Sequence, residues 1–164
     1  MYCTSDRLAM KKIVLLTISL TLALLLSAQM NLDSLRAVIN SDQPYKDQIN
    51  ASLKLVENFQ LKNFDSTLVE GEKALKLARK HTDSISVAEL KRQIGVASYF
   101  KGKYDVAAAN FYESISILEK SNAPTKLAPV YNDLAKLYRK TRDLDRALDN
   151  YNKADAIFRQ LRDT

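Results

Sequence analysis

The chain has 164 residues, of which 46% are hydrophobic and 27% are charged, and this composition is ordinary for one soluble globular domain. Its formal charge of +6 falls to +4, with 22 basic against 18 acidic residues, when residues 1–28 and their Arg7, Lys11, Lys12 and Asp6 are set aside. No concentrated basic stripe accompanies this charge, which excludes a dedicated nucleic-acid binder.

Residues 1–28 have the pattern of a secretory signal peptide. A basic region ending at Lys12 precedes an apolar run at 13–26, and the small residues Ser27 and Ala28 follow. We expect cleavage after Ala28 and an exported protein, periplasmic or secreted. The alternative is an uncleaved segment that anchors the protein in a membrane, although the apolar run is shorter than the about 20 residues that a membrane-spanning helix needs.

Residues 29–44 predict a short helix followed by a turn. Leu32 and Leu35 fall on one helical face together with Val38 or Ile39. The polar turn formers that follow end in a proline, which cannot continue the helical hydrogen bonds.

Residues 45–164 predict an array of three helical hairpins, at roughly 45–80, 84–120 and 124–162. In the central hairpin, apolar residues recur at spacings of three and four on both sides of Gly102, which is the periodicity of two facing helices. No glycine-serine linker or low-complexity stretch separates the hairpins. We therefore expect one continuous domain.

The hairpins coincide when the sequence is shifted by forty residues. The matching sets are Phe64, Tyr104 and Leu144; Asp65, Asp105 and Asp145; Thr67, Ala107 and Ala147; Ala74, Ser114 and Ala154; and Leu77, Ile117 and Ile157. Small residues let the second helix of each hairpin approach its neighbours closely. The aspartates belong to the first turn of that helix, where negative charge complements the helix dipole.

The central hairpin resembles the tetratricopeptide repeat, whose alternation of small and aromatic residues is matched at Gly95, Tyr104, Ala107 and Phe111. The resemblance implies an all-α fold: an α-solenoid of three such hairpins with a short preceding helix. The period of about 40 residues exceeds the about 34 of the minimal repeat. The first hairpin departs from the pattern with Gly71 where an aromatic residue is expected, so its packing and its use as a binding surface have less support.

No catalytic, cofactor-binding or metal site is predicted. The single histidine, His81, lies in a connection between hairpins and is interpreted as a solvated residue at a helix end, while the single cysteine, Cys3, belongs to the leader. Too few ligands remain for a zinc or iron site, and serine has no partner for a catalytic triad. The glycines form no phosphate-binding loop after a strand. We expect a protein that is not an enzyme.

In tetratricopeptide arrays the first helix of each hairpin lines a concave groove. The matching positions here are Arg92, Val96, Tyr99 and Phe100 from the second hairpin and Asn132, Lys136 and Arg139 from the third. Aromatic and basic groups together suit an extended or helical peptide with acidic character. The alternative is that one of the two consecutive aromatics only covers a neighbouring helix. A lysine and asparagine clamp for a terminal carboxylate is not reproduced, because Val96 and Asp133 replace its polar, uncharged groups.

The resemblance implies a non-catalytic scaffold that binds a peptide or protein partner. The alternative is the exported sensory or regulatory region of a longer signalling protein, a histidine kinase or a transcription regulator, because the array is similar to the sensory regions of tetratricopeptide-containing histidine kinases. We expect no nucleic-acid partner, and a membrane only if the leader is uncleaved or the chain is part of a longer protein.

The last predicted helix carries more apolar residues than its partner helix can cover. They are Leu148, Tyr151, Ala154, Ile157, Phe158 and Leu161. We expect an apolar patch, through which the protein self-associates or which further repeats of a longer array cover.

Overall fold

The computed structural model describes residues 17, 29, 31–60 and 62–162. Residues 31–39 are helical. The helices that follow are α2 (Tyr45–Phe59), α3 (Phe64–Lys80), α4 (Ser84–Phe100), α5 (Tyr104–Lys120), α6 (Pro124–Lys140) and α7 (Leu144–Arg162). The described residues contain no strand, and none of their helices is long and apolar enough to cross a membrane. The predicted signal peptide lies outside them except for Thr17.

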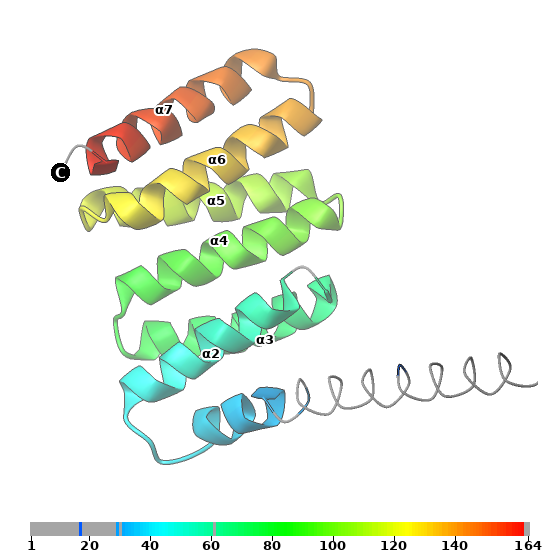
Figure 1. Ribbon diagram of the computed structural model, residues 1–164, viewed down its shortest axis with the longest axis vertical. Helices are drawn as coiled ribbons and strands as arrows, with labels where there is room; N and C mark the ends of the chain where they lie inside the picture. The colour runs from blue at the N-terminus through cyan, green and yellow to red at the C-terminus, as the bar shows by residue number, and fades with distance from the viewer. Residues whose placement is uncertain (1–16, 18–28, 30, 61, 163–164) are drawn as a thin grey trace, which may run out of the picture.

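Successive helices pair into three hairpins that stack in chain order (Figure 1). Within the stack α3 packs on α4 and α5 packs on α6, while the first helices of neighbouring hairpins also meet, α2 with α4 and α4 with α6. The second helices begin forty residues apart, at Phe64, Tyr104 and Leu144. The predicted all-α solenoid of three hairpins with a forty-residue period is therefore confirmed.

Four of the connections between helices have the same backbone turn. Their second residues have φ between +48° and +73°, and these residues are Thr82, Gly102, Asn122 and Arg142. The N–H of the next residue then bonds to the carbonyl five residues back, as Asp83 does to Ala78 at 3.0 Å. This is the Schellman turn, which satisfies carbonyl groups left free at a helix end. Because the turn recurs every twenty residues, α4, α5 and α6 each have 17 residues and begin twenty residues apart.

Helix starts are less uniform than helix ends. The side chain of Asn63 accepts a hydrogen bond from the Ser66 N–H at 3.0 Å, and Asp83 accepts one from Ser86 at the same distance. Each therefore satisfies one free donor of the helix that follows. Helix α5 begins after Lys103, which makes no such bond.

At one equivalent contact, the first hairpin has the opposite choice of residue sizes from the second. In the second hairpin Gly95 of α4 lies under the ring of buried Phe111. Forty residues earlier, α2 has fully buried Leu55 and α3 has buried Gly71. A Cβ at Gly71 would lie 2.9 Å from Cγ1 of Ile94, so this α4 side chain fills the place of the missing aromatic. The space at Gly71 is thus filled from α4, although α2 and α3 contact each other less extensively than α4 and α5 do.

Candidate binding groove

A hollow of about 220 Å³ opens where α4 and α6 come together. Its walls are Gln60, Arg92, Val96, Tyr99, Phe100, Phe111, Asp133 and Lys136. Five of the seven residues predicted to line a groove are among them, from two helices that are not adjacent in the chain. The other two predicted residues, Asn132 and Arg139, are on α6 and do not line this hollow.

An ion pair between α4 and α6 crosses the hollow. Arg92 donates from Nε to Oδ2 of Asp133 at 2.8 Å, and Lys136 donates from Nζ to Oδ1 of the same carboxylate at 3.0 Å. Asp133 is only 8% exposed, so its charge requires these partners. Arg92 is thus engaged within the protein. Arg92 therefore lines the hollow as a residue already paired through Nε, and its charge is shared with Asp133.

Gln60 and Phe111 line the hollow but were not predicted as groove residues, and Asp133 was considered there only as a departure from the carboxylate clamp. Asp133 follows Arg92 by forty-one residues, one more than the repeat, and it is three residues before Lys136. The signal in the sequence was an acidic residue three positions before Lys136, on a helix that otherwise presents apolar and basic groups, because residues at this spacing are neighbours on a helix. Phe111 was recognised for its place in the repeat, and the structure adds that its ring contributes to the floor of the hollow.

Aromatic rings form the wall at the end of α4. Phe100 stacks on Phe64 of α3, with ring centroids 5.0 Å apart and planes at 7°. Tyr99 meets Phe100 edge-on at 5.3 Å and packs against the core of the second and third hairpins. Phe100 therefore covers a neighbouring helix, as the alternative interpretation held, yet it is 51% exposed and both rings face the hollow. An apolar ledge of this kind can hold a large side chain of a partner.

A second hollow of about 320 Å³ also lies between α4 and α6, and it reaches Ser114 and Leu118 of α5. It includes Glu89, Arg92, Lys126 and Pro129, and Arg92 belongs to both hollows. Lys126 pairs with Glu89 across it. The two hollows form one groove over α4 and α6, which we call the α4–α6 groove. Its three basic and two acidic side chains are largely neutralised by one another, so its distinctive surface is apolar and aromatic.

Metal ligands do not gather in the part of the chain that the structure describes. No group of three or more histidine, cysteine, aspartate or glutamate residues there is placed to hold an ion. His81 instead stacks on the ring of Tyr45, with centroids 4.0 Å apart. The hydroxyl of Tyr45 donates to Asp83 at 2.8 Å, and burial together with this carboxylate raises the pKa of Tyr45 to about 12. These contacts hold the first hairpin against the start of α4.

Comparisons with known proteins give one family and several similar folds. Residues 86–160 match the family model for the tetratricopeptide repeat. Comparison with curated protein sequences gives no match.

Three solved structures are similar in fold. BtubC (BKLC) from P. vanneervenii has a TM-score of 0.69 and 20% identity, over 81% of this chain and 55% of that chain. The TPR domain of Arabidopsis FLU has a TM-score of 0.65 and 22% identity, over 71% of this chain and 99% of that one. Aspartyl phosphate phosphatase F from Bacillus subtilis has a TM-score of 0.71 and 20% identity, over 81% of this chain and 36% of that chain. The chain thus spans about half of the first protein and about a third of the last.

Proposed function

Residues 86–160 are tetratricopeptide repeats, and on this premise we propose that the protein is a non-catalytic scaffold that binds a protein partner in the α4–α6 groove. The single observation that supports this most is the convergence of Arg92, Val96, Tyr99, Phe100 and Lys136 on one open hollow. Repeats of this kind present such surfaces for other chains, and the groove has an apolar ledge flanked by charged groups.

The contacts within the groove indicate which partner chemistry it suits. An apolar or aromatic side chain of the partner would lie against Tyr99 and Phe100, where burial of apolar area stabilises the complex. Lys136 is exposed and shares one carboxylate with Arg92, and Arg139 forms no ion pair with the described residues. An acidic residue beside the apolar anchor would meet these cations. We therefore propose an apolar anchor as the main determinant and acidic character as the lesser one.

The test is selection of peptides from a random display library on the purified chain, followed by measurement of Kd by fluorescence anisotropy. Phe100→Ala should weaken the selected peptides about tenfold or more, as truncation of an anchor-binding aromatic does. Lys136→Glu should weaken acidic peptides by a smaller factor.

The matched controls remove similar groups outside the groove. Val69→Ala shortens an apolar side chain that is equally exposed on α3, and Lys140→Glu reverses an exposed charge at the end of α6. Both controls should keep the wild-type Kd. Peptides that bind all four variants alike would mean that the groove is not the binding surface.

We propose export as the location, on the pattern of residues 1–28 alone. In a bacterial host the mature chain should begin at Gln29, which mass spectrometry of the periplasmic fraction would detect. Full-length protein in membranes would support the uncleaved anchor, and recovery in the cytosol would contradict both. The alternative of a sensory region in a longer signalling protein requires that the reading frame continue past Thr164 into a kinase or DNA-binding module.

A further inference from the structure

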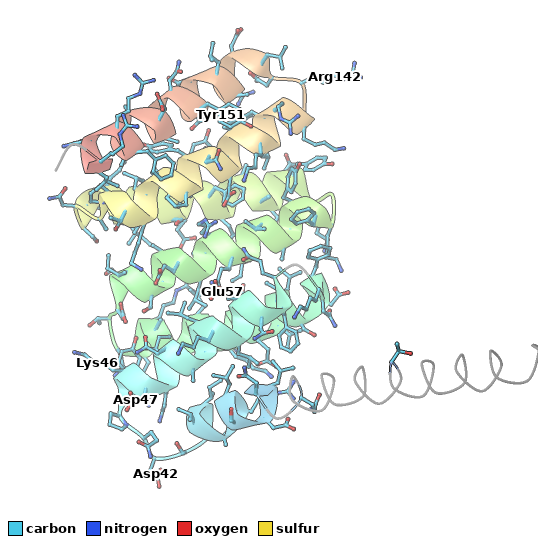
Figure 2. The ribbon with its side chains drawn as sticks, viewed as in Figure 1. Asp42, Lys46, Asp47, Glu57, Arg142 and Tyr151 are labelled. Carbon is cyan, nitrogen blue, oxygen red and sulfur yellow. The ribbon has the colours of Figure 1, made fainter. Side chains whose placement is uncertain are left out.

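Helix α7 carries a row of apolar side chains along the edge of the face that packs on its hairpin, and three of the four are exposed. Leu144, Leu148 and Phe158 are 66%, 62% and 48% exposed, and half-buried Tyr151 lies between them. Their spacings of four, three and seven residues bring them to one side of the helix. Figure 2 shows Tyr151 on α7, the last helix of the stack. We call these four residues the α7 row.

The same row is covered in the preceding hairpin. Forty residues before Tyr151 and Phe158 are Phe111 and Leu118 of α5, both 1% exposed. Their cover comes from α4 of the same hairpin, where Phe111 lies on Gly95, and from α6 of the next hairpin, which also packs on α5. The backbone of α7 lies next to α6 alone among the described helices. The exposed part of the α7 row is therefore on the side where α5, in the preceding hairpin, packs against the helix that follows it.

We propose that the α7 row docks on the α7 row of a second copy of this chain, with the two helices antiparallel and crossing at Tyr151. This surface is separate from the α4–α6 groove and does not depend on the function proposed for it. Leu144 and Phe158 lie seven residues on either side of Tyr151. A two-fold axis at Tyr151 consequently places Leu144 of each copy on Phe158 of the other, as an isologous interface requires.

The distribution of charge along α7 favours a second copy of the chain as the partner, and it favours the antiparallel orientation. Residues 144–152 carry Asp145, Arg146 and Asp149, a net charge of −1, and residues 153–162 carry Lys153, Asp155, Arg159 and Arg162, a net charge of +2. Within the helix Lys153 pairs with Asp149 and Arg159 pairs with Asp155, so the difference between the two halves is modest. Antiparallel pairing brings the acidic end of one copy to the basic end of the other, and it also opposes the two helix dipoles. A parallel pair would set like charges together. The helix is thus complementary to itself in one orientation.

One residue limits the strength of the contact. Asp155 lies between Tyr151 and Phe158 in the place where α5 has buried Ile115. It pairs with Arg159 at 2.8 Å, which keeps it compatible with a partly solvated interface. A helix of 19 residues is about 28 Å long, so one helix pair gives an interface at the small end of the observed range. We therefore expect a weak dimer, with a Kd of roughly micromolar to millimolar order.

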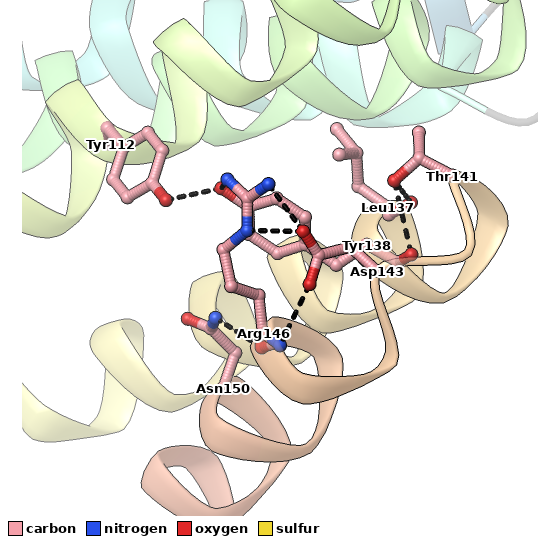
Figure 3. Close-up of polar contacts among 7 residues, drawn as sticks. All are labelled: Tyr112, Leu137, Tyr138, Thr141, Asp143, Arg146 and Asn150. Carbon is pink, nitrogen blue, oxygen red and sulfur yellow. Dashed lines mark hydrogen bonds and ion pairs between the residues drawn. The ribbon is translucent and has the colours of Figure 1, made fainter.

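Polar contacts hold the start of α7 in place, so the row is formed before a partner arrives. Figure 3 shows Arg146 beside Tyr138 and Asp143. The guanidinium carbon of Arg146 lies 4.4 Å from the centroid of the Tyr138 ring, and its Nε donates to Asp143 at 2.6 Å. The Tyr138 hydroxyl in turn bonds that of Tyr112 on α5 at 2.5 Å. A preformed surface loses less conformational entropy on docking.

Sedimentation velocity of the purified chain over a range of concentrations measures the association. The wild type should shift from monomer toward dimer as concentration rises, and Leu148→Glu should remain monomeric. The matched control is Val69→Glu, which places the same charge at a comparably exposed apolar position on α3 and should dimerise like the wild type. A wild type that stays monomeric at millimolar concentration, or a dimer that Leu148→Glu leaves intact, would overturn the proposal.

Disulfide cross-linking tests the orientation in a Cys3→Ser background, which removes the one natural cysteine. Tyr151→Cys should cross-link to itself. Leu144→Cys should cross-link to Phe158→Cys when the two variants are mixed, and neither should cross-link alone. Self-cross-linking of Leu144→Cys would show a parallel pair and overturn the antiparallel arrangement. Peptide binding to Leu148→Glu should match the wild type, because Leu148 does not line the α4–α6 groove.

Discussion

Helices α5 and α7 take the same place in consecutive hairpins and differ in what covers them. Both turn small residues toward their own hairpin, Ala107 and Ala147, and both of these are buried. On the adjoining face α5 buries Phe111, Ile115 and Leu118. At the same places α7 has half-buried Tyr151, exposed Asp155 and exposed Phe158. A repeated pattern thus predicts which face of a helix is apolar. Whether that face is buried depends on the next helix in the stack.

The largest expected change in stability comes from a substitution on the face that α5 and α7 each bury against their own hairpin. Ala107→Asp would bury an unpaired charge between α5 and its neighbours, at a cost of about 3–5 kcal/mol in the free energy of unfolding. Thermal and urea melts would measure it. If the variant melts like the wild type, Ala107 does not pack as the structure places it.

Lys103→Asp is the control for that variant, and it should move stability the other way. Lys103 stands at the N-cap of α5 without a capping hydrogen bond. Aspartate there can accept from the free N–H groups and complement the helix dipole, which would stabilise the fold by about 1 kcal/mol. The two aspartate variants should therefore melt on opposite sides of the wild type.

A matched pair of truncations measures the difference between the covered and the uncovered face. Leu118→Ala removes a buried side chain from α5 and should cost about 3 kcal/mol, whereas Phe158→Ala at the equivalent position of α7 should cost about 1 kcal/mol or less. Urea melts at low protein concentration keep the proposed dimer from contributing. Equal costs would mean that Phe158 is covered in solution, and the comparison of the two helices would then fail.

The contact between Gly95 and Phe111 gives a smaller effect. A Cβ at Gly95 would lie 2.6 Å from Cε1 of Phe111, so Gly95→Ala requires the ring to move. Overpacking costs about 1–3 kcal/mol and the gain in helix propensity returns about 0.5–1 kcal/mol, which leaves a net loss of about 1 kcal/mol. Adding Phe111→Leu should relieve the clash, so the double variant should lose less stability than the sum of the two single variants. Strict additivity would contradict the contact.

The smallest effect concerns Tyr131, whose hydroxyl donates to Glu119 at 2.5 Å across the covered interface between α6 and α5. Burial, and then this carboxylate, raise the pKa of Tyr131 above its usual value. A raised pKa in the folded state means that the stabilisation is complete below about pH 10, the pKa of an unfolded tyrosine, and is lost as pH rises further. The stability difference between the wild type and Tyr131→Phe should therefore shrink from pH 9 to pH 11 in urea melts. A constant difference would exclude this linkage.

Much of the fold was available from the sequence. Helix periodicity and the recurrence of positions at forty residues predicted the hairpins, and Gly95, Tyr104, Ala107 and Phe111 predicted the repeat family that residues 86–160 match. The reason is that apolar spacing within a helix and the turn that ends it are local properties of the chain. For the same reason, residues at matching positions on α4 and α6 were expected to share one groove, and five of them line one hollow.

What the tertiary structure decided depends on contacts between different hairpins. The sequence did not show that Arg92 is neutralised by Asp133, because two residues forty-one apart become neighbours only after α6 stacks on α4. Nor did it show that Ile94 fills the space above Gly71. Leu144 aligns with Phe64 and Tyr104, yet it is exposed, because no described helix lies over that face of α7. Whether a residue is buried or paired depends on the neighbours that it contacts in the fold, and a repeat pattern in the sequence does not identify those neighbours.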